Sequence, residues 1–150
     1  RARWENEHII VTLKWKGSAV DGLHVRGELN VPADEAYLTE PNVEIFRGSE
    51  IFEELEEAAG GKKLVQVMEM DFLRRSIQVD TGSSISVISV DEGLIRTAKG
   101  DAEILEVEVE LYSGNQEDMI ALSEELADKY NLIPCDVSKY QRGLELLGLE

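Results

Sequence analysis

Three glutamates alternate with apolar residues in the segment 105–111. Glu106, Glu108 and Glu110 each follow a Leu or Val. Successive side chains of a strand point to opposite faces, so the three carboxylates would share one face within about 14 Å. Like charges at this spacing repel one another, and a bound cation would relieve the repulsion. Carboxylate oxygens are the ligands that hard divalent cations prefer. The pattern therefore indicates a metal-binding strand face.

Charged residues show the same two-residue spacing elsewhere in the chain. The pairs are Arg1 with Arg3, Lys14 with Lys16, and Arg26 with Glu28. Lysine and arginine side chains bind anions through charge-assisted hydrogen bonds. A closed barrel with a polar interior would bring these acids and bases together, which suits a polyphosphate and its divalent metal. The alternative is a one-sided sheet whose charged face is simply solvated.

A second motif lies at Asp80-Thr81-Gly82-Ser83. It resembles the signature of aspartic proteases, in which two Asp-Thr-Gly loops share a proton between their carboxylates. One copy in 150 residues would require a homodimer. The other interpretation is a hairpin turn, because Asp, Gly and Ser are preferred in tight turns. The protease hypothesis also leaves the charged strand faces unexplained.

Composition excludes several classes of protein. The chain has 150 residues, 43% hydrophobic and 31% charged, which predicts one globular domain. Its net charge of −16 argues against binding to nucleic acid or to an anionic membrane surface. The single cysteine excludes an internal disulfide framework. We expect a cytoplasmic protein. Polar and apolar residues already alternate from the first residue onward, as they do inside a strand. We therefore expect this chain to be the later part of a longer protein.

Hydrophobic periodicity predicts an α+β fold built on an antiparallel sheet or barrel. Helices are expected from a cap at Ser49 to Gly60, from a cap at Asn115 through Tyr130, and from a cap at Asp136 to Leu147. Gly17 and the turn at residues 21–22 are expected to interrupt the early strands. Strands are expected at residues 1–3, 9–16, 23–31, 64–79, 85–91, 94–97 and 104–111.

The order of several short motifs resembles the CYTH superfamily, the triphosphate tunnel metalloenzymes. The sequence is similar to bacterial CYTH-domain proteins of the inorganic triphosphatase type. Each motif is short, but their order and spacing extend over nearly the whole chain. The matching segments are Arg1-Ala2-Arg3, Thr12-Leu13-Lys14, residues 22–28, Asp71-Phe72-Leu73-Arg74-Arg75, the turn-like residues 90–93, residues 105–111 and residues 138–143.

The resemblance implies a fold and a set of site residues. The fold would be an antiparallel eight-stranded β-barrel or tunnel with flanking helices. Residues 1–150 would form one CYTH-like domain that lacks its first strand, which carries the family's Glu-x-Glu-x-Lys motif. Lys14 and Glu28 would be catalytic, and Glu28 and Asp91 would pair with basic residues. Mg²⁺ or Mn²⁺ would bind Glu106, Glu108 and Glu110. The triphosphate would bind Arg1, Arg3, Lys14, Arg26, Arg74 and Lys139.

The activity implied is metal-dependent hydrolysis of inorganic triphosphate or a related triphosphate. Alternatives are an adenylate cyclase of the class IV type, an organic triphosphatase, or a non-catalytic module that binds polyphosphate or nucleotide. The expected partner is a small molecule containing a triphosphate, and a homodimer is a further expectation. Ser76 stands where relatives often have a second arginine. Arg75 has the opposite strand parity to Arg74 and is expected to point away from the site.

Overall fold

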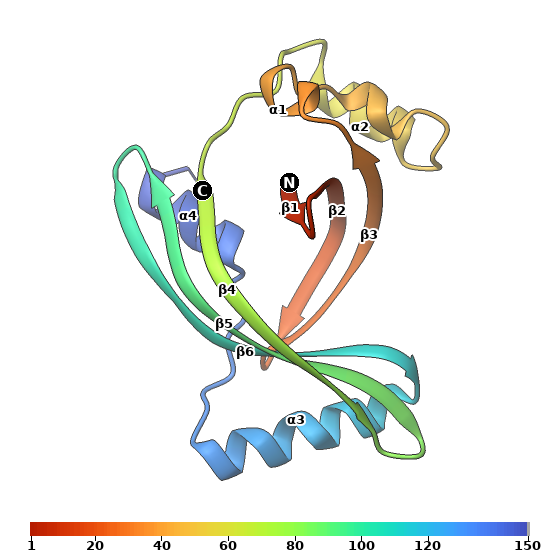
Figure 1. Ribbon diagram of the computed structural model, residues 1–150, viewed down its shortest axis with the longest axis vertical. Coiled ribbons are helices and arrows are strands. Elements are labelled where there is room, and N and C mark those ends of the chain that lie inside the picture. Colours follow the sequence, from red (N-terminus) through yellow and green to blue (C-terminus); the bar gives the residue numbers. More distant parts are fainter. Residues whose placement is uncertain (150) are drawn as a thin grey trace. The chain divides into compact units, whose positions relative to one another are not determined.

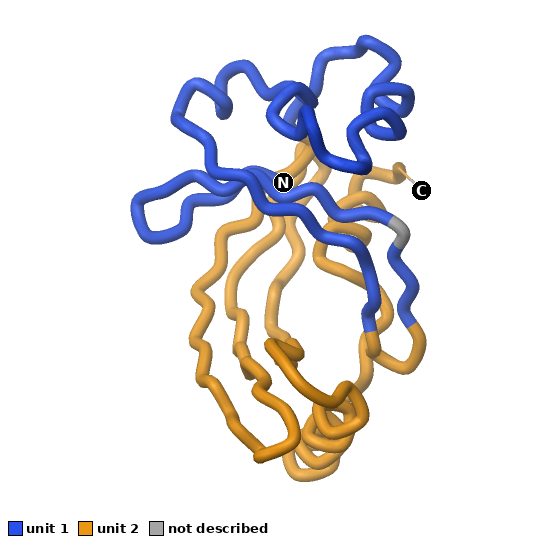
Figure 2. Tube along the Cα trace, turned by 90° about the vertical axis from the view of Figure 1, so that its right-hand side faces the viewer, with its two compact units in different colours: residues 1–19, 24–66 blue, residues 20–23, 67–150 orange. Residues whose placement is uncertain are grey.

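The fold is of the α+β class. The computed structural model describes residues 1–149, apart from the side chain of Lys16. The chain forms two compact units, shown in Figure 2. Unit 1 comprises residues 1–19 and 24–66, and unit 2 comprises residues 20–23 and the chain from residue 67 onward. Each unit is built on a three-stranded sheet.

Hairpins form the sheet of unit 1, in the order β1-β2-β3. Its strands are β1 (Ala2–Glu5), β2 (His8–Val20) and β3 (Leu23–Ala33). β1 and β2 are antiparallel and form a hairpin. Asn6 and Glu7 form that turn with positive φ angles of 47° and 68°. Gly17 was expected to interrupt the chain, but it lies inside β2, and the strand continues until the turn at Asp21 and Gly22.

The core of unit 1 lies on the apolar face of this sheet. Ile9 and Val11 are buried there against Phe46 and Phe52. These aromatic residues come from short helices, of which only the last was predicted. The helices are α1 (Ala36–Thr39), the 3₁₀ helix η1 (Val43–Phe46) and α2 (Phe52–Ala59).

The predicted cap of α2 is wrong at its beginning and correct at its end. The N-cap residue is Ile51, and the Ser49 hydroxyl is buried without a hydrogen-bond partner. Ser49 lies two residues before the N-cap, in the turn that precedes the helix. There its backbone carbonyl, and not its side chain, accepts a hydrogen bond from the Phe52 N–H. Gly60 ends the helix in the left-handed conformation, as expected for a C-terminal glycine.

Three long antiparallel strands form the sheet of unit 2, in the order β4-β5-β6. They are β4 (Glu69–Asp80), β5 (Ser84–Thr97) and β6 (Gly100–Gly114). Figure 1 shows that they run side by side through a pronounced bend. Residues 64–68 were expected to belong to the first of these strands, but they lie outside it.

The predicted turn at residues 90–93 is also wrong, because β5 passes through it without a break. Gly93 lies opposite Phe72 of β4. A Cβ atom on Gly93 would lie 2.2 Å from the Asp71 carbonyl oxygen and 2.5 Å from the Phe72 Cα. The glycine is therefore needed for close strand packing rather than for a turn. Since the two predicted strands merge here, the described residues form six strands, fewer than the eight that the resemblance implied.

Two helices complete unit 2, α3 (Gln116–Tyr130) and α4 (Lys139–Leu147). The predicted cap of α3 is confirmed, because the Asn115 side chain accepts from the Glu117 N–H at 2.8 Å. The predicted cap of α4 is wrong: Ser138 caps the helix, and Asp136 instead accepts a 2.5 Å hydrogen bond from the Gly22 N–H. Within the described part of the chain, no helix has the length and hydrophobicity needed to cross a membrane.

Candidate metal and phosphate site

One face of the β4-β5-β6 sheet carries most of the charged candidate residues. Arg74 of β4 lies opposite Asp91 of β5, which in turn lies opposite Glu106 of β6. Glu108 lies two residues further along β6, opposite Ser89. Because alternate residues of a strand share a face, the strand register gathers one arginine and three carboxylates on the same surface.

Two acidic residues of β6 are less exposed than their apolar neighbour Leu105. Leu105 has 74% of its surface exposed, whereas the side chains of Glu106 and Glu108 are 24% and 32% exposed. Asp91 is fully buried. A one-sided sheet with a solvated polar face would show the reverse order. That interpretation therefore does not hold for Glu106 and Glu108.

Arg74 joins two of the carboxylates. Its guanidinium donates two hydrogen bonds of 2.7 Å to Asp91, from Nε to Oδ1 and from Nη2 to Oδ2. Nη2 also donates to Oε2 of Glu108 at 2.6 Å. The ring of Phe72 lies 5.8 Å from the guanidinium carbon on the same face of the sheet. This bidentate arrangement fixes the plane of the guanidinium as well as its position.

Helix α4 brings a second cation to the same carboxylates. The Lys139 ammonium lies 2.8 Å from Oδ2 of Asp91 and 2.7 Å from Oε1 of Glu108. It also donates to Oε1 of Glu106. Arg142, one helical turn later, donates to the other oxygen of Glu106 at 2.8 Å. Three acids and three bases therefore form one interlocked cluster, which we call the acidic cluster: Arg74, Asp91, Glu106, Glu108, Lys139 and Arg142.

The pKa values in the acidic cluster reflect this pairing. Burial alone would raise the pKa of Glu108, but the Lys139 hydrogen bond and the nearby positive charges lower it to about 2. Burial opposes ionisation of Asp91 too, yet hydrogen bonds from Arg74 and Lys139 hold its pKa below the usual value. Burial would lower the pKa of Lys139, and its three carboxylate partners raise it instead. All three groups are therefore charged at neutral pH.

The carboxylates could hold a metal ion. Asp91, Glu106 and Glu108 each offer an oxygen within 4.8 Å of the other two. The Lys139 ammonium shows that a cation fits among them. Three carboxylate oxygens are also the donor type that Mg²⁺ and Mn²⁺ prefer. Glu110, the third predicted ligand, lies outside this group; it is 60% exposed and approaches Arg74 at 3.8 Å.

A separate polar cluster lies on the sheet of unit 1. Lys14 of β2 and Glu28 of β3 form an ion pair of 2.9 Å, as the resemblance implied. Asn30 donates to Glu28 at 3.1 Å and accepts from the Thr12 hydroxyl at 2.6 Å. Arg3 of β1 also donates to the Thr12 hydroxyl. The predicted polar face of this sheet is thus confirmed as a hydrogen-bonded row.

Partial burial shifts the pKa values of the Lys14–Glu28 pair. The pKa of Lys14 is lowered, chiefly by burial and in part by the charge of Arg26, although Glu28 opposes the shift. Burial would raise the pKa of Glu28, but hydrogen bonds from Lys14 and Asn30 lower it. Glu28 is therefore an anion that holds the lysine ammonium in place.

The remaining predicted positions are less enclosed. Arg1 and Arg26 are exposed. The side chain of Lys16 lies outside the described residues. Arg75 points away from the acidic cluster, as its parity predicted; it is 63% exposed and lies 3.5 Å from Glu92.

The Asp80-Thr81-Gly82-Ser83 segment is the tight turn between β4 and β5. The Asp80 side chain accepts from the Gly82 N–H at 2.8 Å, which closes the turn. The hydroxyls of Thr81 and Ser84 both donate to Asp118 at the start of α3. These contacts account for the motif as a turn that anchors a helix.

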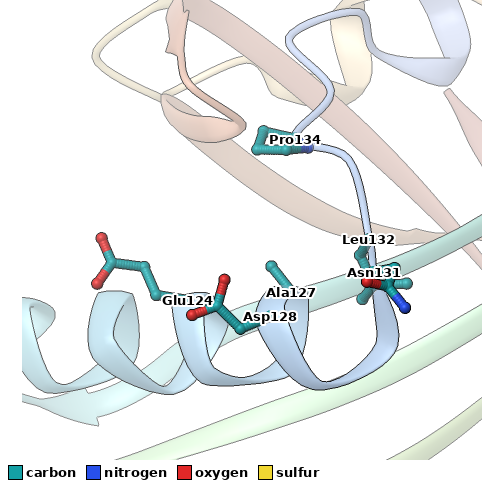
Figure 3. A pocket seen from close by; sticks show the side chains of 6 residues that line it. All are labelled: Glu124, Ala127, Asp128, Asn131, Leu132 and Pro134. Atoms are coloured by element: carbon teal, nitrogen blue, oxygen red, sulfur yellow. The ribbon is translucent and has the colours of Figure 1, made fainter.

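A pocket of about 540 Å³ lies elsewhere in unit 2, along α3 and the segment that follows it (Figure 3). Two of the six residues that line it, Glu124 and Asp128, are acidic, and none is a lysine or arginine. A triphosphate carries several negative charges and would be repelled there. The acidic cluster with its cations is the better candidate for a metal and phosphate site.

Sequence reasoning missed two groups at these sites. Arg142 could have been found, because it follows Lys139 by three residues and so lies on the same face of a helix. Asn30 was expected on the polar face of its strand with Arg26 and Glu28, because the three alternate with apolar residues, but it was not assigned to the site.

The fold and the charged strand faces together define a class of protein. The chain belongs to the CYTH family, whose domain description matches residues 1–144. It is also 34% identical over 148 residues to an inorganic triphosphatase of Haemophilus influenzae. That alignment covers 99% of this chain and 40% of the relative, so the chain spans about 40% of the length of that protein.

Proposed function

We propose that this chain carries the metal-binding and phosphate-binding residues of an enzyme that hydrolyses inorganic triphosphate. The observation that carries the proposal is the acidic cluster, in which three carboxylates converge on a single cation beside two arginines. The similarity to an inorganic triphosphatase supports the choice of substrate. Membership in the CYTH family supports the same chemistry.

Asp91, Glu106 and Glu108 would hold the divalent metal, Mg²⁺ or Mn²⁺. A metal bound there would neutralise the charge of the phosphate oxygens and orient the triphosphate. Arg74 is placed beside the same carboxylates and would bind a phosphate group through Nη1, because its Nε and Nη2 donate to Asp91 and Glu108. Lys139 would serve as a further phosphate ligand, and Glu110 remains a candidate for a weaker metal contact.

The polar row of unit 1 is a separate set of groups suited to phosphate. Lys14 would bind a phosphoryl group there. Glu28 would act as a positioning residue, because it holds the lysine ammonium at 2.9 Å. Arg1, Arg3 and Arg26 would add positive charge to the same sheet. Hydrolysis then consists of the attack of water on the terminal phosphorus, with the charge that develops stabilised by fixed cations.

The test is phosphate release from tripolyphosphate by the purified protein in the presence of Mg²⁺ or Mn²⁺. We expect turnover that disappears on chelation with EDTA and falls by about 100-fold or more in Glu106→Ala, which removes one of three proposed metal ligands. Glu92→Ala is the matched control, since Glu92 is 65% exposed and pairs only with Arg75 among the ion pairs described. No release by the unmodified protein would contradict the proposal. Formation of cyclic AMP from ATP would favour the cyclase alternative.

A further inference from the structure

The Lys139 ammonium occupies the position that a metal ion would take. It contacts one oxygen from each of the three carboxylates that the proposed function assigns to the metal. Those oxygens lie within 4.8 Å of one another, so there is room for a single cation among them. Metal–oxygen distances of about 2.0–2.2 Å would bring the metal into the volume that the ammonium fills. The two cations cannot occupy this position together.

Charge counting leads to the same conclusion. Asp91, Glu106 and Glu108 contribute three negative charges, and Arg74, Lys139 and Arg142 contribute three positive charges in direct contact with them. The cluster is therefore neutral as it stands. A divalent cation added to it would gain little attraction unless one of the internal cations withdrew.

Lys139 is the cation that must withdraw, because it is the one in contact with all three carboxylates. It is the first residue of α4, and its ammonium is carried on a flexible four-carbon stem. The rest of the helix is held by other contacts. Gly143 lies so close to Met68 that a Cβ atom would approach its sulfur to 2.4 Å, and Arg142 donates to the Glu103 carbonyl at 3.1 Å. Rotation of the Lys139 side chain would free the carboxylates while α4 stayed in place.

We propose that Lys139 is an internal counter-ion that a divalent metal must displace before it binds Asp91, Glu106 and Glu108. This inference rests on the proposed function. Once displaced, the ammonium loses its carboxylate partners and becomes available to an anion. Metal binding and triphosphate binding are then coupled through one side chain, because the metal releases the cation that the triphosphate uses.

The test is a calorimetric titration of Mn²⁺ alone, without triphosphate, into the unmodified protein and Lys139→Met. We expect Lys139→Met to bind Mn²⁺ at least about tenfold more tightly, because the competing charge is gone. Arg75→Met is the matched control: it removes one positive charge from the same sheet, but from an exposed group that pairs with Glu92 and faces away from the acidic cluster. Its affinity should change by less than about threefold.

Three results of this titration would overturn the inference. Equal or weaker binding by Lys139→Met overturns the inference and leaves the metal site of the proposed function standing. Absence of Mn²⁺ binding in both proteins overturns the inference together with that metal site. An equal gain in Arg75→Met shows a general charge effect and also overturns the inference.

A second measurement needs no variant, which matters because Lys139 is 9% exposed and its replacement leaves buried acids unpaired. The rate of acetylation of each lysine by N-hydroxysuccinimide acetate would be measured by mass spectrometry with and without Mg²⁺. We expect labelling of Lys139 to rise at least about fivefold with Mg²⁺, while that of the exposed Lys63 stays constant. An unchanged rate at Lys139 under saturating Mg²⁺ overturns the inference.

Discussion

Asp91 is fully buried, and its carboxylate accepts two parallel hydrogen bonds of 2.7 Å from the guanidinium of Arg74. A buried carboxylate is costly to desolvate, and this cost is offset only when charged partners satisfy its oxygens. Arg74 does so across the β4–β5 pairing, and Lys139 adds a third contact from α4. Asp91 therefore links the sheet, the helix and the candidate site.

Removing this carboxylate should destabilise unit 2. We expect Asp91→Ala to lower the free energy of unfolding by about 3 kcal/mol, near the low end for a broken buried ion pair, since the Arg74 side chain is 35% exposed. Denaturant unfolding measures this change. Glu92→Ala, the next residue of the same strand, should cost less than about 0.5 kcal/mol because its pair with Arg75 is exposed. Equal losses in the two variants would contradict a structural role for the Arg74–Asp91 pair.

Stability should fall as the acidic cluster is protonated. The pKa of Glu108 is about 2 in the folded protein, against an ordinary value of 4.5. A lowered pKa stabilises the folded state above pH 4.5, and this stabilisation is lost as the pH falls toward 2. Because the Glu108 side chain is 32% exposed, solvent screening reduces the effect to about 1–2 kcal/mol.

Unfolding measured between pH 6 and pH 2.5 tests this dependence. Glu108→Gln should show a shallower loss of stability with falling pH than the unmodified protein. Part of the loss will remain in the variant, because the pKa values of Asp91 and Glu28 are also lowered. Glu92→Gln should retain the full slope. Parallel curves for Glu108→Gln and the unmodified protein would show that Glu108 is not paired as described.

Gly93 should be intolerant of a side chain. A Cβ atom there would lie 2.2 Å from the Asp71 carbonyl oxygen, so backbone must move. We expect Gly93→Ala to reduce stability by about 1–3 kcal/mol, as for other overpacked sites. Gly17→Ala is the control, since its Cβ would have its nearest neighbour at 3.6 Å. A change within about 0.5 kcal/mol for Gly93→Ala would mean that β4 and β5 are not packed this closely.

The contribution of Lys14 can be measured by binding. We expect Lys14→Ala to weaken tripolyphosphate binding by about 1.5–3 kcal/mol, the loss of a charge-assisted hydrogen bond. That corresponds to about a 10- to 150-fold rise in the dissociation constant. Arg75→Ala removes a charge that faces away from the acidic cluster and should change binding by less than about twofold. A loss below about 0.3 kcal/mol for Lys14→Ala would show that Lys14 does not contact the ligand.

Local alternation in the sequence predicted which strand faces carry charge. The period of two placed Glu106 and Glu108 on one face and separated Arg74 from Arg75, and both predictions agree with the structure. Alternation depends only on neighbouring residues, so it can be followed directly along the chain. It could not show which face is buried, because that depends on how α4 packs on the sheet.

Boundaries and long-range pairs were harder to predict. Asp136 and Ser138 are both good N-cap residues; in the structure Asp136 accepts from Gly22, and Ser138 caps the helix. Glu92-Gly93 has the composition of a turn, yet the close approach of Phe72 requires the glycine within a strand. The place of Lys139 among three carboxylates depends on residues 31–48 positions away in sequence, and no local pattern contains that information.

A metal bound in the acidic cluster should support triphosphate binding. The most direct measurement is a calorimetric titration of tripolyphosphate into the protein with Mg²⁺ and, separately, with EDTA. We expect Mg²⁺ to tighten binding by at least about tenfold, and the Glu106→Gln, Glu108→Gln double variant to lose that gain. Equal affinity with Mg²⁺ and with EDTA, or no binding in either, would contradict the claim.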